Sequence, residues 1–251
     1  MPANLGWVRQ FHKPTAADLP PLLICPHAGT GASFYRSLAK VFGQHFDVVV
    51  FQYPGRQDRA KEAALETVPE IAAGALADYL ASQHNRGLPL TVFGHSMGAM
   101  VAFELVRAAE AAGHEVRLLA ASAAVSPGKA AELPPHPSED EKILDHLGSL
   151  EGTGADVLAS REIMRMALPV VKADYKAFDA YTCAPDVKVR ARIHALGGTE
   201  DPFVTPRDLY GWGNHSEQEL EVTVFDGGHF YLSDNAAGLA EVLAPEMQGA
   251  R

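Results

Sequence analysis

A serine between two glycines gives the first indication of chemistry. Residues 94–98 read Gly-His-Ser-Met-Gly and follow the apolar run 90–93. Such a pentapeptide lets a strand turn sharply into a helix, and the positions two residues from the serine must then carry almost no side chain. Gly94 and Gly98 meet that need. The hydroxyl of Ser96 would stand at a helix N-terminus, where free N–H groups favour negative charge, so the pattern predicts a nucleophile.

A purely structural Gly-rich turn is the alternative, and the context decides against it. The run before the pentapeptide is short and apolar, and residues 99–107 continue as an almost wholly apolar helical pattern. A helix buried against a central sheet has this composition.

A serine hydroxyl needs a base, and with this pentapeptide the acid and then the histidine follow the nucleophile along the chain. Of the 11 histidines, His229 fits best, because it lies in a Gly-rich loop after the strand pattern 220–225. We expect His194 to be a core or sheet-face residue and His215 to lie in a surface loop. His95, beside the serine, is expected to pack or to support the site.

The acid that orients the histidine is predicted to be Asp201, in the loop 197–202 after the strand pattern 191–196. Glu200 is a weaker alternative, and Asp226 is more typical of a turn. The other common position for the acid, residues 122–126, holds no carboxylate. That absence strengthens the assignment of Asp201.

Acyl transfer also needs N–H donors aimed at the developing oxyanion. The backbone N–H of Met97, directly after the nucleophile, is one predicted donor. Ala28 is the second, in the Gly-rich loop at 26–31 that follows the strand pattern 22–25. A phosphate-binding loop is the alternative for that segment, but the Gly-Lys-Ser/Thr of a P-loop is missing.

These residues need a scaffold, and short apolar runs that alternate with helical patterns predict one. Strands are expected at 7–11, 22–25, 46–51, 90–93, 116–121, 189–196 and 220–225. Helices are expected at 33–42, 68–83, 97–112, 139–149, 161–181 and 236–247. The alternation predicts the α/β class, a mostly parallel central sheet flanked by helices, in a single domain over residues 1–251.

One segment breaks the alternation. A Pro-rich stretch at 133–137 is followed by two helical patterns, separated by Gly-Thr-Gly at 152–154, and no strand pattern returns until about residue 187. We therefore expect a helical insertion at 127–187, on the carboxyl-end side of the sheet where ligands bind. It would form a lid over Ser96, with Pro169 as a point of flexion. A subdomain without a role at the site is the alternative.

The composition and net charge of the chain exclude some classes of binding partner. The 251 residues are 47% hydrophobic and carry a net charge of −10, which argues against nucleic acid and anionic membranes as partners. Two cysteines are too few for a disulfide framework. The first seven residues lack a signal-peptide pattern, and no run is long enough to cross a membrane. The predicted location is cytoplasmic.

Four separated motifs then point to one family: Pro-His-Ala-Gly at 26–29 with Ser-Phe-Tyr at 33–35, Tyr-Pro-Gly-Arg at 53–56, Gly-His-Ser-Met-Gly at 94–98, and Asp201 with Gly-His-Phe at 228–230. Over about residues 7–245 the chain resembles the type II thioesterases, the stand-alone editing hydrolases of polyketide and nonribosomal peptide synthesis. The resemblance implies an α/β-hydrolase fold with a helical lid, and a catalytic triad of Ser96, His229 and Asp201. Gly-Thr-Gly at 29–31 departs from the glycine pair expected there.

By the same resemblance, the substrate is an acyl group on the phosphopantetheine thiol of an acyl or peptidyl carrier protein. The partner brings that group, so no metal ion or cofactor of the chain's own is expected. Carrier proteins are commonly acidic, and an acidic chain needs a local basic patch to dock them. Arg56, Arg59 and Lys61 form one candidate patch, and a lid helix carries another (Arg161, Arg165 and Lys172). Ordinary solvated charge is the favoured alternative for both.

Three other functions stay open. A carboxylesterase or lipase would share the fold and the triad. A non-catalytic receptor or scaffold with a hydrolase fold is a second possibility, although such proteins often lose a triad member and all three candidates are present. The third is a thioesterase domain cut from a larger synthase, and the stand-alone form is preferred because the chain begins at Met1.

Overall fold

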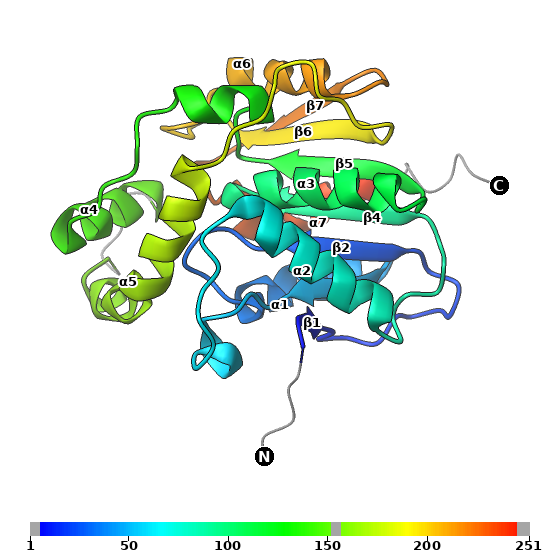
Figure 1. The fold of residues 1–251 in the computed structure, drawn as a ribbon, viewed down its shortest axis with the longest axis horizontal. Helices are drawn as coiled ribbons and strands as arrows, with labels where there is room; N and C mark the ends of the chain where they lie inside the picture. The colour runs from blue at the N-terminus through cyan, green and yellow to red at the C-terminus, as the bar shows by residue number, and fades with distance from the viewer. Residues whose placement is uncertain (1–5, 152–156, 245–251) are drawn as a thin grey trace.

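The computed structural model describes residues 6–151 and 157–244, and a mixed sheet forms its centre (Figure 1). Within the described residues the strand order is β1-β3-β2-β4-β5-β6-β7. Only β1 runs antiparallel to its neighbour. The bounds are β1 Val8–Arg9, β2 Pro21–Cys25, β3 Asp47–Phe51, β4 Leu90–His95, β5 Val116–Ser122, β6 Arg192–Gly198 and β7 Glu221–Phe225. The predicted α/β class with a mostly parallel sheet is confirmed.

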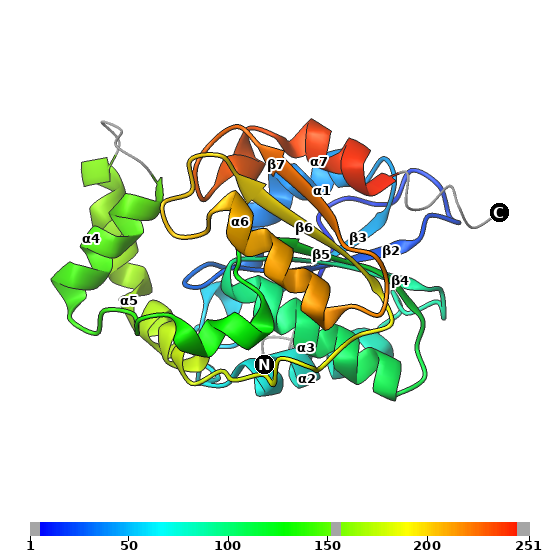
Figure 2. The ribbon, with the colours of Figure 1, turned by 90° about the horizontal axis from the view of Figure 1, so that it is seen from above.

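Helices cover both faces of the sheet. Figure 2 shows α1 (Arg36–Phe42) and α7 (Ala236–Leu243) on one face, and α2 (Val68–Ala81) and α3 (Met97–Ala111) on the other. Because both faces are covered, β2, β3 and β4 are buried along their whole length and are mostly apolar. Helix α3 is buried on most sides, as its apolar sequence predicted.

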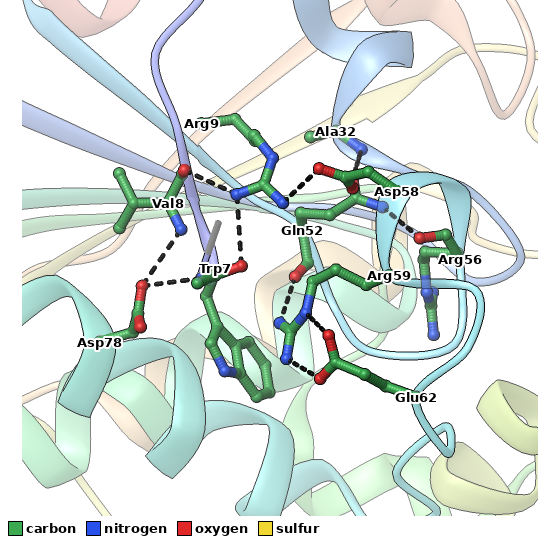
Figure 3. Close-up of polar contacts among 11 residues, drawn as sticks. Trp7, Val8, Arg9, Ala32, Gln52, Arg56, Asp58, Arg59, Glu62 and Asp78 are labelled. Atoms are coloured by element: carbon green, nitrogen blue, oxygen red, sulfur yellow. Dashed lines mark hydrogen bonds and ion pairs between the residues drawn. The ribbon is translucent and has the colours of Figure 1, made fainter. Parts of the chain in front are cut away.

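The edge strand β1 is fixed to the layer of helices. The carboxylate of Asp78, on α2, accepts the backbone N–H groups of Trp7 and Val8 (Figure 3). The guanidinium of Arg59 lies 4.8 Å from the Trp7 ring and also binds Glu62. These contacts anchor a strand of only two residues, shorter than the predicted 7–11.

A helical segment separates β5 from β6. Among its described residues it holds α4 (Asp140–Glu151), α5 (Val157–Asp179) and a 3₁₀ turn at Pro127–Glu132, but no sheet strand. In Figure 1, α4 and α5 lie beyond the end of the sheet toward which the arrowheads of β5 and β6 point. The predicted turn at 152–154 lies outside the described residues. The lid over 127–187 stays a prediction.

The prediction for His215 was wrong. Its ring is 1% exposed, Nδ1 donates to the carbonyl of Val187 at 2.8 Å, and Nε2 accepts the N–H of Gly128 at 3.1 Å. A 3₁₀ turn, Tyr210–His215, carries this imidazole. It binds the chain near both ends of the helical segment, which explains why a histidine in a polar run is buried.

Other boundaries differ by a few residues. The predicted helix 33–42 is a 3₁₀ turn at Ala32–Tyr35 followed by α1, and the strand predicted at 189–196 begins at Arg192. Helix α6 (Pro206–Leu209) was not predicted. Residues 245–247 of the last predicted helix lie outside the described part. None of the described helices combines the length and apolar character that crossing a bilayer requires.

Candidate active site

Ser96 occupies the turn between β4 and α3 in a strained backbone conformation. Its φ and ψ are 55° and −124°, values that few residues other than glycine adopt. The Ser96 N–H donates to the carbonyl of Ser122 at the end of β5, at 2.8 Å. The residue is half-buried. The sharp turn predicted from the pentapeptide is therefore present.

The two glycines of the pentapeptide are required by packing. A Cβ at Gly94 would lie 2.1 Å from the carbonyl oxygen of Gly98, and a Cβ at Gly98 would lie 2.1 Å from that of Cys25. Side chains cannot approach backbone so closely. The first turn of α3 thus packs directly on the end of β2, next to the loop at 26–31.

His229 and Asp201 form a buried pair. The Nδ1 of His229 lies 2.7 Å from Oδ2 of Asp201, and the two side chains are 4% and 0% exposed. The other carboxylate oxygen accepts the N–H groups of Phe203 and Val204 at 2.9 and 3.1 Å. Three N–H groups therefore hold one carboxylate, and its bond to Nδ1 leaves Nε2 of the imidazole to act as a base.

Backbone bonds join the two loops that carry this pair. Thr199 N–H donates to the carbonyl of Phe225, and Glu200 N–H to that of Gly227, both at 2.9 Å. A Cβ at Gly198 would lie 2.4 Å from the carbonyl oxygens of residues 227 and 228. The ends of β6 and β7 thus fix the spacing of carboxylate and imidazole.

The His229 ring lies beside the serine turn. Its centroid is 5.2 Å from that of His95, the residue before Ser96, and Ser96 and His229 line the same cavity. Within the described residues the Ser96 hydroxyl makes no hydrogen bond. Catalytic hydrogen bonds are often long without substrate and tighten when it binds.

Two backbone N–H groups of residues beside the cavity have no acceptor among the described residues. Met97 is the first residue of α3, so its N–H has no intrahelical partner. In the loop at 26–31, His27 N–H donates to the Tyr35 hydroxyl and Gly29 N–H donates to Asp174. The N–H of Ala28, between them, has no acceptor among the described residues. Both predicted donor residues line the cavity.

Two further imidazoles beside His229 are electrically neutral. Burial, with smaller effects from His229 and Arg56, lowers the pKa of His27 to about 3. Burial, with His229 and His27, also holds the pKa of His95 well below its usual value. His95 Nδ1 lies 2.9 Å from the Ser122 hydroxyl, so its predicted supporting role has a structural basis. Neither ring adds positive charge next to a protonated His229.

The cavity above Ser96 has a volume of about 1220 Å³. Loops at the sheet end supply one side, and α4, α5 and the Pro-rich stretch supply the other. His146, Tyr175 and Phe178 are among the lining residues from the helical segment. His194, by contrast, binds Thr223 through Nε2 and lies outside the lining, as expected.

For Arg56 and Arg59 of the first candidate patch, both the docking hypothesis and the favoured alternative of ordinary solvated charge were wrong, whereas Lys61 is exposed. Arg56 is 5% exposed and forms a bidentate pair with Asp174 of α5, with N–O distances of 2.7 and 2.8 Å. Arg59 is 7% exposed and binds Glu62. Neither charge is available to a partner.

The second patch is largely neutralised by α4. Arg165 pairs with Glu141 and Lys172 with Asp140. The side chain of Arg161 lies outside the described residues. The buried pair of Arg56 and Asp174 was missed. A carboxylate on the apolar stripe of α5, three residues after Val171, was a signal for it.

Comparison with known proteins identifies the family. A family model described as the thioesterase domain matches residues 20–246. The chain belongs to the thioesterase family. The thioesterase PikA5 of Streptomyces venezuelae is 35% identical to this thioesterase over 91% of the chain and 80% of the relative. The structure of the type II thioesterase BorB from the borrelidin biosynthetic cluster is 37% identical, with a TM-score of 0.83 over 96% of this chain and 97% of that one.

The phenyloxazoline synthase MbtB of Mycobacterium tuberculosis is 39% identical over 98% of this chain. The chain spans only 17% of the length of that relative. The resemblance to type II thioesterases and the α/β-hydrolase fold expected from the motifs are confirmed.

Proposed function

We propose that the chain is a serine thioesterase that hydrolyses acyl groups from the phosphopantetheine thiol of acyl or peptidyl carrier proteins, in an editing role in polyketide or nonribosomal peptide synthesis. The observation that carries the proposal is the buried Asp201–His229 pair, whose imidazole lines the same cavity as the strained Ser96 turn. The similarity to BorB and PikA5 supports the class of substrate.

In the proposed first step, Nε2 of His229 takes the proton of Ser96 as the hydroxyl oxygen attacks the thioester carbonyl. The negative charge that forms on the carbonyl oxygen is stabilised by the N–H groups of Met97 and Ala28. The carbon–sulfur bond breaks, the thiol leaves with the proton from His229, and an acyl-serine remains.

Water completes the cycle. His229 takes a proton from water, the hydroxide attacks the acyl-serine, and the carboxylic acid leaves as Ser96 regains its proton. Asp201 holds the imidazole in the required tautomer and stabilises its charged form. The atoms balance with water alone, so the proposal includes no metal or cofactor.

The cavity volume supports a carrier-bound substrate. About 1220 Å³ is larger than most small-molecule sites, and leaves room for both an acyl group and part of a pantetheine arm. The partner is then a carrier protein, and a cytoplasmic location remains part of the proposal.

The test compares one acyl group on a carrier-protein thioester with the same acyl group on a matched oxygen ester, using Ser96→Ala as the blank. We expect hydrolysis of the thioester by the wild type and background rates in the variant. Hydrolysis of the oxygen ester alone would favour an esterase. Full thioester hydrolysis by the variant would remove Ser96 from the mechanism.

A further inference from the structure

A buried ion pair joins the helical segment to the core of the sheet. Arg56 follows β3 in a loop, and Asp174 lies on α5, 118 positions later. Both terminal guanidinium nitrogens, Nη1 and Nη2, bind the carboxylate, at 2.7 and 2.8 Å, and the side chains are 5% and 0% exposed. The proposed chemical steps do not use this pair.

The pair also holds the loop at 26–31, called here the oxyanion loop. Oδ2 of Asp174 accepts the N–H of Gly29 at 2.7 Å, and Arg56 donates to the carbonyl of Thr30 at 3.3 Å. Gly29 directly follows Ala28, the proposed oxyanion donor. One carboxylate thus fixes both a guanidinium and the peptide that joins Ala28 to Gly29.

Apolar packing also holds the oxyanion loop against α5. Gly29 has φ of +76°, and a Cβ there would lie 2.5 Å from Cγ2 of Val171. Ala28 packs against the small apolar cluster of α4 and α5 that contains Val171 and Tyr175. Helix α5 therefore lies against the oxyanion loop with no space between them.

Arg56 is itself held in place. The fully buried amide of Gln52 donates to the carbonyl of Arg56 at 2.9 Å and accepts the N–H of Ala32 at 2.7 Å (Figure 3). Ala32 comes directly after the oxyanion loop. The same amide therefore ties the backbone of Arg56 to the far end of that loop.

We propose that Arg56 and Asp174 are positioning residues that aim the Ala28 N–H at the oxyanion by fixing the oxyanion loop to α5. The inference rests on the proposed function, because it assigns the pair to the oxyanion donor of that mechanism. An oxyanion donor acts most strongly in the transition state, so its displacement lowers kcat more than it raises KM. If the ion pair only held α5 in place for substrate binding, its removal would mainly raise KM.

The main variant is the double substitution Arg56→Met with Asp174→Leu. Replacing both members of a buried pair by apolar side chains of similar size is often neutral for stability, whereas removing one leaves an unpaired buried charge. Gly29 N–H loses its acceptor in this variant. The matched control is Arg59→Met with Glu62→Leu. Arg59 lies in the same loop as Arg56, and its side chain contacts Glu62, the backbone carbonyl of Gln52 and the Trp7 ring.

Each variant is assayed with a soluble acyl-pantetheine thioester, so that carrier docking has no influence, and thermal unfolding is recorded for each. We expect the double variant to lose kcat by about tenfold to a hundredfold with KM within about threefold, and the control to stay within about twofold. Asp174→Asn keeps one acceptor oxygen for Gly29 and should lose about threefold in kcat, less than the double variant.

Wild-type kcat in the double variant, or a loss confined to KM, would overturn the proposal. If the double variant does not fold, the kcat of Asp174→Asn is the test. A wild-type kcat in Asp174→Asn would also overturn the proposal. A wild-type protein that fails to hydrolyse the thioester would instead refute the proposed function, so the two failures are distinguishable.

Discussion

Asp201 and His229 are joined at 2.7 Å across two loops, and neither side chain is accessible to solvent beyond 4%. Two backbone N–H groups bind the second oxygen of the same carboxylate. The carboxylate can only accept a hydrogen bond from Nδ1, so it fixes the imidazole tautomer. In the proposed mechanism, this relationship determines that Nε2 of His229 acts as the base.

Asp201→Asn tests that relationship. An amide can donate to Nδ1 and thereby stabilise the wrong tautomer, and the expected loss in kcat is about 10⁴-fold. Steady-state hydrolysis of an acyl thioester measures it. Glu200→Gln is the control, since the carboxylate of Glu200 is exposed. A loss of less than tenfold in Asp201→Asn would mean that the carboxylate does not orient the base.

Gly98→Ala tests the packing of the serine turn. The new Cβ would lie 2.1 Å from the carbonyl oxygen of Cys25, so the first turn of α3 must move. We expect a loss of about 3 kcal/mol in the free energy of unfolding, from overpacking. Gly213→Ala is the control, since its Cβ would come no closer than 3.6 Å to any neighbour. Equal urea midpoints for the two variants would contradict this packing.

The neutral histidines predict a dependence of stability on pH. The pKa of folded His27 is about 3, below its ordinary value of 6.5, so the unfolded chain takes up a proton first as the pH falls. The contribution of neutral His27 to the free energy of unfolding is therefore fully present above pH 6.5 and is lost progressively below it. Between pH 6 and 5, His27→Asn should reduce the slope of the unfolding free energy by about 1 kcal/mol per pH unit. Urea titrations measure it, and an unchanged slope would show that His27 is charged in the folded protein.

His215 is predicted to stabilise the fold without acting in catalysis. His215→Ala removes the partners of Gly128 N–H and the Val187 carbonyl, at an expected cost of about 2 kcal/mol. The control His114→Ala, at a half-buried ring, should cost less than about 1 kcal/mol. Thermal and urea unfolding compare the two. If the His215→Ala protein were as stable as the control, the hydrogen bonds of His215 to Gly128 and Val187 would not stabilise the fold.

Local sequence was enough to predict where the candidate site residues lie. The sharp turn at Ser96 requires glycine two residues before and after it, which makes the turn visible in the sequence. His229 and Asp201 follow predicted strands, in loops that a parallel sheet brings to one edge. Composition and alternation were enough to predict the sheet, because buried parallel strands are apolar along their length.

Contacts between segments far apart in the chain could not be predicted from the sequence. Arg56 and Asp174 are 118 positions apart, and only the fold shows that they meet. The sequence therefore predicted an exposed Arg56, either as solvated charge or in a docking patch. His215 was assigned to a surface loop because polar neighbours surround it, whereas its partners Gly128 and Val187 lie far away in the chain. Single polar residues buried by remote partners leave no periodic pattern.

Covalent labelling is the most direct test of the central claim, that Ser96 is a nucleophile activated by His229. A fluorophosphonate is incubated with the wild type, with His229→Ala and with Ser96→Ala, and the adduct is located by peptide mass spectrometry. We predict one rapid adduct on Ser96, slowed at least a hundredfold in His229→Ala and absent in Ser96→Ala. An adduct on another residue, or equal labelling of Ser96 without His229, would contradict the account.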